Sequence, residues 1–148
     1  MSTEKLLKDG QLKKHRTSKE EVAALLRVAK RDIADSKVIG VSTDRRFATA
    51  YNAILQLSAI ILACRGYRAA GWAHHYTTFE TLYEILGQTY EDRIAYFDQC
   101  RTKRNVADYS RVGEVTEHEV AELISEAESF MKVTIGWLKQ NYPQYLSA

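Results

Sequence analysis

Apolar residues recur at helical spacing in the first half of the chain. Ser18 and Glu21 have the spacing of a capping box, and the apolar positions that follow predict a helix: Val22, Leu25, Leu26, Ala29 and Ile33. A second helix is predicted to begin at Thr43 or Asp44, because both are favourable N-caps. The apolar face of this second helix contains Phe47, Tyr51, Ile54, Leu57, Ile61 and Leu62. Its second half is apolar enough to make it the central, most buried helix.

The second half of the chain continues the helical pattern after one irregular segment. Residues 67–76 lack a helical period and are expected to form a loop. Three further helices are predicted. A short one begins at Thr77–Thr78 with a threonine cap and ends at Gly87, and the next runs from about Tyr90 to roughly Tyr109. The last begins with a capping box of Thr116 and Glu119 and ends at Pro143.

These elements predict an all-α fold, an up-and-down bundle of four to five helices. No window alternates convincingly with the period of two that a half-buried strand requires. The bundle is expected to occupy residues 18–148, and residues 1–17, which are polar and basic, are expected to form a flexible or short-helical N-terminal arm.

The composition agrees with a small helical protein without a cofactor. One proline and seven glycines in 148 residues are too few for the many turns of an all-β domain. The longest apolar run, Ala53–Cys64, is shorter than the ~18 residues that span a bilayer. No signal peptide is apparent, so a cytoplasmic protein without membrane contact is predicted. Cys64 and Cys100 lack the spacing of a metal or disulfide motif, which indicates buried free thiols and no metal site.

The formal net charge of +2 conceals two regions of opposite charge. The segment Cys100–Arg111 has a formal charge of +3, and Thr116–Phe130 contains five glutamates and no lysine or arginine. The glutamates of the last helix are expected on a solvated face. The basic segment is more informative, because it contains most of the polar residues that could carry chemistry.

On a helix, the basic segment continues the apolar face of the residues before it. At about 100° per residue, one broad face contains Ile94, Phe97, Arg101, Arg104, Asn105 and Asp108. Charged side chains are seldom placed on an inward face unless they are paired or functional. Two interpretations follow. Arg104 and Asp108 could form an internal i,i+4 salt bridge that stiffens the bundle, or this face could form a binding or catalytic site.

This segment resembles the signature of the HEPN superfamily of all-helical domains. In that signature an arginine, often followed by asparagine or another polar residue, precedes a histidine by four to six positions. Here Arg104 and Asn105 match the start of the motif. The chain departs from the pattern at the histidine position, which is occupied by Tyr109 and preceded by Asp108.

The resemblance implies association with RNA or nucleotides. Many HEPN proteins are metal-independent endoribonucleases, toxins or defence effectors, and they commonly dimerise so that two motifs face one cleft. Others are non-catalytic partners of small nucleotidyltransferases. A homodimer, with an RNA or nucleotide ligand or a nucleotidyltransferase antitoxin as partner, is therefore expected, and whether the chain is an enzyme stays open. A structural homodimer without a ligand is the remaining alternative.

The resemblance also suggests roles for individual residues. Arg104 suits a phosphate, because its planar guanidinium matches phosphate oxygens, and it forms a candidate catalytic set with Asn105, Asp108 and Tyr109. A phenol with a pKa of about 10 is a poor base, but Tyr109 could contact a phosphate or stack on a base. Candidate substrate-binding residues are Arg101, Lys103, Arg111, His74 and His75.

His74 and His75 could supply the imidazole that the motif lacks. A histidine suits proton transfer near neutral pH. Metal binding by the pair is not indicated, since adjacent side chains point apart on regular structure. Trp72, Tyr67 and Tyr76 lie in the same irregular segment and are candidates for a stacking surface, whereas Tyr51 is expected to belong to the core.

Overall fold

The computed structural model describes residues 2–71, 73–109 and 115–146, with side chains outside 106–109. Its α-helices are α1 (Thr3–Lys8), α2 (Lys19–Ser36), α3 (Thr43–Cys64), α4 (His74–Leu86), α5 (Glu91–Tyr109) and α6 (Glu117–Asn141). Two short strands, β1 (Leu12–Lys14) and β2 (Tyr67–Ala69), and two 3₁₀ turns, η1 (Gln88–Tyr90) and η2 (Pro143–Tyr145), complete the described elements.

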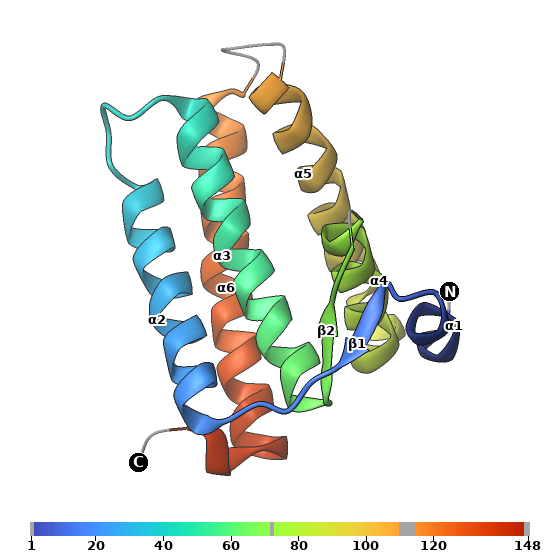
Figure 1. Ribbon diagram of the computed structural model, residues 1–148. Coiled ribbons are helices and arrows are strands. Elements are labelled where there is room, and N and C mark those ends of the chain that lie inside the picture. The colour runs from blue at the N-terminus through green and yellow to red at the C-terminus, as the bar shows by residue number, and fades with distance from the viewer. Residues whose placement is uncertain (1, 72, 110–114, 147–148) are drawn as a thin grey trace.

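The long helices form an up-and-down bundle around α3 (Figure 1). Helices α2, α3, α5 and α6 lie side by side with alternating directions, and α3 packs against α2, α4, α5 and α6. The shorter α1, β1, β2 and α4 cover the lower part of α5 and α3 in this view. The predicted all-α bundle is confirmed.

The helix starts follow the capping signals of the sequence. The Ser18 hydroxyl accepts a hydrogen bond from the Glu21 amide at 3.1 Å, at the start of α2. At the start of α6, Thr116 and Glu119 form the reciprocal capping box, with distances of 3.0 and 3.1 Å. The cap of α3 is Ser42, one residue before the predicted pair, and its hydroxyl accepts from the Arg45 amide at 3.3 Å.

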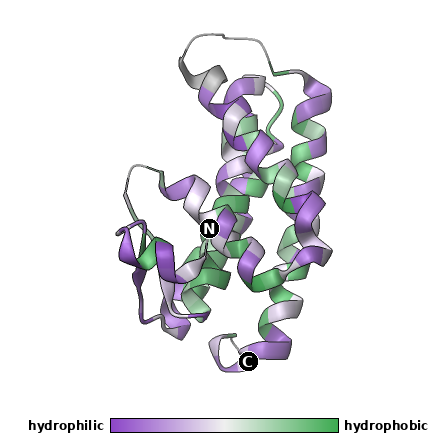
Figure 2. Cartoon of the chain, turned by 90° about the vertical axis from the view of Figure 1, so that its right-hand side faces the viewer, coloured by the Kyte–Doolittle hydropathy of each residue, from purple (hydrophilic) through white to green (hydrophobic). Residues whose placement is uncertain are grey.

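Helix α3 is the centre of the hydrophobic core, as its sequence predicts. Ala50, Ile54, Leu57 and Ile61 are fully buried on it, and Figure 2 shows apolar positions where the helices face one another. A window of 18 residues in α3 has a mean hydropathy of 1.6, so apolar character extends beyond Ala53–Cys64 and would suffice to cross a membrane by length and composition. Of that window 67% is buried against the other helices, as in the core helix of a soluble protein.

Part of the predicted N-terminal arm packs on the bundle. Residues 3–8 form the short helix α1, and β1 pairs antiparallel with β2, with Lys13 opposite Arg68. Leu6 and Leu12 are buried in the core, with exposed fractions of 0% and 1%. The strands were not expected, because three residues are too few to show a period of two.

The start of α4 differs from the prediction. The helix begins at His74 and not at a threonine cap, and Ala73, its N-cap, makes no side-chain capping bond. The Thr77 amide donates to the Ala73 carbonyl at 3.0 Å, which is already a helical bond, and Thr77 and Thr78 are buried inside the helix. Within the expected loop at residues 67–76, the structure therefore has β2 at 67–69 and the first turn of α4 from His74.

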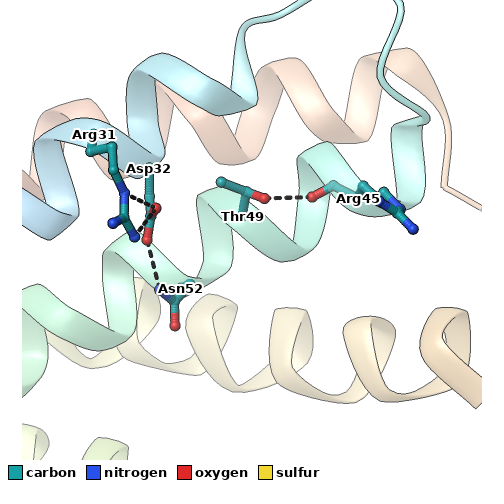
Figure 3. A network of polar contacts seen from close by, with 5 residues as sticks. All are labelled: Arg31, Asp32, Arg45, Thr49 and Asn52. Atoms are coloured by element: carbon teal, nitrogen blue, oxygen red, sulfur yellow. Dashed lines mark hydrogen bonds and ion pairs between the residues drawn. The ribbon is translucent and has the colours of Figure 1, made fainter.

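A buried carboxylate joins α2 to α3 (Figure 3). Asp32 is only 4% exposed. It accepts hydrogen bonds from Asn52 Nδ2 at 2.6 Å and from two nitrogens of Arg31 at 3.0 and 3.2 Å. A buried carboxylate is tolerated only when it is paired in this way, so this contact sets the position of α2 against the middle of α3.

The acidic face of α6 is paired and not merely solvated as expected. Four of its glutamates contact basic side chains of α3, of α5 and of the C-cap of α2: Glu117 with Arg46 at 2.9 Å, Glu119 with Lys103 at 2.9 Å, Glu126 with Arg93 at 3.6 Å and Glu128 with Lys37 at 2.8 Å. The charge asymmetry of the sequence is therefore partly neutralised between neighbouring helices.

The contact of β1 with the core predicts a large effect of one apolar side chain. Leu12→Ala should lower the free energy of unfolding by about 2–5 kcal/mol, because it removes a fully buried leucine. Lys13→Ala, at an exposed neighbouring position, is the control and should change it by less than about 0.5 kcal/mol. Urea denaturation measures both. A Leu12→Ala midpoint equal to that of the wild type would show that residues 1–17 do not contribute to the fold.

Candidate functional site

The N-terminus of α4 and the C-terminal half of α5 border an open pocket of about 640 Å³, the α4–α5 pocket. It is lined by Ala73, His74, His75, Tyr76, Arg101, Arg104 and Asn105. Six of the residues singled out in the sequence, from two distant segments, therefore meet at one place. Buried Ile94 and Phe97 anchor α5 in the core one to two turns earlier, and this fixes which face of α5 meets the pocket.

Both arginines of the pocket lie over tyrosine rings. The guanidinium of Arg104 is 5.7 Å from the centre of the Tyr51 ring, and that of Arg101 is 5.6 Å from the centre of the Tyr76 ring. Arg101 Nε also donates to Asp98 at 2.8 Å, and this hydrogen bond raises the pKa of Arg101 further. Both cations are thus held at defined positions.

Tyr51 connects the pocket to the core of the bundle. It is 1% exposed, and its ring meets Phe79 edge-on at 6.1 Å. Its hydroxyl lies 3.1 Å from Nδ1 of His75. Burial raises the pKa of the Tyr51 phenol, against the opposing effect of Arg104 and Arg101, so the hydroxyl stays protonated. The Tyr51–His75 hydrogen bond is therefore one between neutral groups.

His75 is held as a neutral imidazole. Burial is the main cause that lowers its pKa to about 4, and the positive charges of His74, Arg104 and Arg101 lower it further. Its Nδ1 is engaged by Tyr51, so Nε2 is the nitrogen left for a ligand. Nε2 accepts a hydrogen bond if Nδ1 donates to Tyr51, and it donates one if the Tyr51 hydroxyl donates to Nδ1.

His74 presents a proton acceptor to solvent. Its Nδ1 is 3.2 Å from the Gly71 carbonyl oxygen, which can only accept, so Nδ1 carries a proton. In the neutral ring, Nε2 then holds the lone pair. Gly71 has φ +83°, and a Cβ there would lie 3.0 Å from the Gln11 side chain, so glycine is required at the residue that orients His74.

The N-terminus of α4 adds to the positive potential of the pocket. The first amide groups of a helix have no partner within the helix, and they carry the positive end of its dipole. The N-cap residue of α4, Ala73, makes no side-chain capping bond to these groups. Together with Arg101 and Arg104, they make the α4–α5 pocket suited to an anion.

Comparison with known protein families decides the identity of the fold. The model of the SAV_6107-like HEPN family matches residues 40–134, which is more than half of the chain. The chain belongs to this family. No curated protein and no solved structure matches it. The matched span of this HEPN protein contains the whole α4–α5 pocket, whereas α1, β1 and α2 lie outside it.

Not every candidate of the HEPN motif reaches the pocket. Lys103 points to α6, where its ammonium group pairs with Glu119 at 2.9 Å and lowers the pKa of that glutamate. Asp108 and Tyr109 belong to α5, but their side chains lie outside the described residues, as do Arg111 and Trp72. The assignment of Asp108, Tyr109 and Arg111 to a site stays a prediction.

Tyr51, whose spacing in the sequence predicts only a core position, contacts two residues that line the α4–α5 pocket. Its ring is indeed buried, but its hydroxyl and its upper ring face reach His75 and Arg104. The available signal was chemical: a buried tyrosine hydroxyl needs a hydrogen-bond partner, and a phenylalanine would fill the same space without one. Tyr76, expected on a stacking surface, is 40% exposed and lines the pocket.

The cysteines take no part in the α4–α5 pocket. Cys64 and Cys100 are buried free thiols, and burial raises the pKa of each to about 11, so neither is a thiolate at neutral pH. Among the residues that the structure describes, no group of three or more histidine, cysteine, aspartate or glutamate side chains could hold a metal ion.

The low pKa of His75 predicts a pH dependence of stability. An unfolded histidine has a pKa of about 6.5, so the unfolded chain takes up a proton first as the pH falls, and stability decreases from about pH 6.5 towards pH 4. Between pH 7 and pH 5 the loss from this residue should be about 2 kcal/mol. Urea denaturation at both values should show it in the wild type.

His75→Gln tests the assignment, because an amide can still bond to Tyr51 but does not titrate. This variant should lose the part of the pH dependence that His75 contributes. His118→Gln, at an exposed position on α6, should retain the wild-type pH dependence. An unchanged pH dependence in His75→Gln would contradict a neutral, buried His75.

Proposed function

We propose that this HEPN protein binds RNA in the α4–α5 pocket, with Arg104 contacting a backbone phosphate. One observation carries the proposal: Arg101, Arg104 and Asn105 of α5 meet His74 and His75 at the start of α4. The histidine that the family motif requires is absent from its position in the sequence, yet two imidazoles lie in the same pocket as the motif arginine.

The chemistry of the pocket matches a phosphodiester. A guanidinium can bind two phosphate oxygens at once, and helix N-termini bind phosphates through their unpaired amides. The Asn105 side chain offers both a donor and an acceptor. The exposed ring of Tyr76 could stack on an unpaired base next to the phosphate. A mononucleotide shares part of this chemistry, so it is one arm of the experiment below.

A second function, RNA cleavage without a metal, is favoured by the geometry of His74. Its Nε2 lone pair could remove the proton of a 2′-hydroxyl, whose oxygen then attacks the neighbouring phosphorus. The bond from phosphorus to the 5′ oxygen breaks, that oxygen takes a proton from water, and a cyclic phosphate is left. Arg104 would stabilise the charge on the phosphate oxygens during this step.

Tyr109 at the histidine position of the motif favours a non-catalytic alternative. In that case the protein would bind RNA or nucleotide, or serve as partner to a small nucleotidyltransferase, without cleaving RNA. We propose a cytoplasmic homodimer in either case; the homodimer is expected from the resemblance to the superfamily. A toxin or defence role requires the catalytic form.

RNA binding should depend on Arg104. Fluorescence anisotropy with a labelled single-stranded RNA in 0.1 M salt should give a Kd that is at least tenfold weaker for Arg104→Ala, because a charged hydrogen bond to phosphate is lost. Arg27→Ala removes the same charge from an exposed position on α2 and should stay within twofold of the wild type. A mononucleotide competitor separates nucleotide from RNA binding.

Cleavage is tested by incubating the protein with the same RNA in the presence of a metal chelator and separating the products on a gel. His74→Ala should abolish cleavage but weaken RNA binding less than Arg104→Ala does, because the phosphate contact of Arg104 remains. Binding without cleavage by the wild type would select the non-catalytic alternative. Equal affinities of Arg104→Ala and the wild type would refute a phosphate site at the α4–α5 pocket.

A further inference from the structure

The α4–α5 pocket is the first of three hollows that share lining residues. His74 also borders a middle hollow of about 340 Å³ between α2, α3, β2 and α4. His15 and Tyr67 border both this middle hollow and a basal hollow at the end of α3. The three hollows therefore follow one another along the molecule.

The two ends of this series are cationic. Arg101 and Arg104 lie in the α4–α5 pocket, and Lys14, Arg16 and Arg65 line the basal hollow. Arg65 is held there by its guanidinium, which lies 5.2 Å from the centre of the Trp137 ring and 5.5 Å from that of Tyr142. The charge pattern therefore suits a ligand with negative groups at both ends.

The middle hollow differs in character from both ends. Its walls are mainly apolar, with Leu25, Leu55, Ala59 and half-buried Tyr67. Its polar lining consists of the Gln56 amide, the exposed Arg68, His15, His74, Thr78 and Glu21. The Glu21 carboxylate is oriented by His15 at 2.6 Å and Thr17 at 2.7 Å. Small-molecule sites have this make-up, with volumes of about 300–1,000 Å³.

We propose that the three hollows form one track for single-stranded RNA, with a nucleobase in the middle hollow and phosphates at both cationic ends. The inference rests on the proposed function and adds the form of the ligand. A base must be unpaired and unstacked to enter an apolar hollow, so duplex RNA does not fit. Gln56 offers a donor and an acceptor to the base edge, and Glu21 an acceptor.

The length of the track follows from α3. Arg104 lies over Tyr51, and Arg65 is the C-cap of the same helix, fourteen residues later. At a rise of 1.5 Å per residue these points are about 21 Å apart along the helix. A strand stacked at 3.4 Å would need about six nucleotides to span this distance, and an extended strand fewer. A dinucleotide would reach only one end.

The track is tested with 2′-fluoro RNA of two and of six nucleotides, which lacks the attacking hydroxyl. Lys14→Ala/Arg16→Ala, at the basal end, should weaken hexanucleotide binding at least tenfold in 0.1 M salt and leave dinucleotide binding unchanged. Its hexanucleotide affinity should also depend less on salt, with a slope reduced by about 1.4 for two lost contacts. Arg27→Ala/Lys30→Ala, both exposed on α2 and outside the hollows, is the matched control.

Two variants test the middle hollow. Ala59→Leu narrows it and Gln56→Ala removes its amide, and each should weaken hexanucleotide binding at least fivefold. Melting temperatures and unchanged dinucleotide binding show that the variants are folded. Arg104→Ala should weaken binding of both RNAs.

The outcomes separate this inference from the proposed function. If Arg104→Ala abolishes binding while the basal and middle variants bind the hexanucleotide like the wild type, the track is wrong and the phosphate site stands. If the wild type binds neither RNA, both are wrong. If the basal and middle variants lose only hexanucleotide binding, the track is supported.

Discussion

The hydroxyl of Tyr51 is the constraint from which the site follows. Helix α3 is the apolar centre of the bundle, and a tyrosine in its core needs a partner for its hydroxyl. His75 provides that partner at 3.1 Å, so the first turn of α4 is held against α3. The Arg104 guanidinium lies 5.7 Å from the centre of the same ring, so α5 is brought to the same place. One buried aromatic side chain thus positions groups from three helices.

The electrostatics of the pocket follow from the same arrangement. His75 is driven to its neutral form because it is buried beside cationic groups, whereas Arg101 is charged, as arginine is at neutral pH, and its hydrogen bond to Asp98 raises its pKa further. Neutral imidazole and permanent positive charge therefore coexist in one pocket. That combination suits an anionic ligand that carries a removable proton close to its negative charge. The glutamates of α6 pair with Lys37, Arg46, Arg93 and Lys103, none of which lines the pocket, whereas Arg101 and Arg104 do line it.

Much of the fold could be predicted because its signals are local. Ser18 and the Thr116–Glu119 pair cap helices through bonds to residues three positions away, and the apolar period identifies the faces of α2 and α3. The strands β1 and β2 could not be predicted, since their pairing joins residues about 55 positions apart and each strand has only three residues. The start of α4 was misplaced, because a threonine near a helix start is a capping signal only when its side chain is free to reach the amides, and Thr77 is buried.

In the candidate site, too, local features could be predicted from the sequence and tertiary contacts could not. Arg104 and Asn105 could be assigned from the motif, and the helical face that carries them continues the buried face of Ile94 and Phe97. The meeting of this face with His74 and His75 is a tertiary contact, which no spacing in the sequence reveals. Lys103 was grouped with the site because of its charge, but it lies on the α6 side of the helix, where Glu119 pairs with it.

The central claim is that RNA binds where His74 and His75 meet Arg104. The most direct measurement is the imidazole ¹⁵N spectrum of the protein during titration with single-stranded 2′-fluoro RNA. The resonances of His74 and His75 should shift in proportion to the bound fraction, while that of His118, on the exposed start of α6, stays in place. If the protein is saturated with RNA and the resonances of His74 and His75 do not shift, the claim is contradicted.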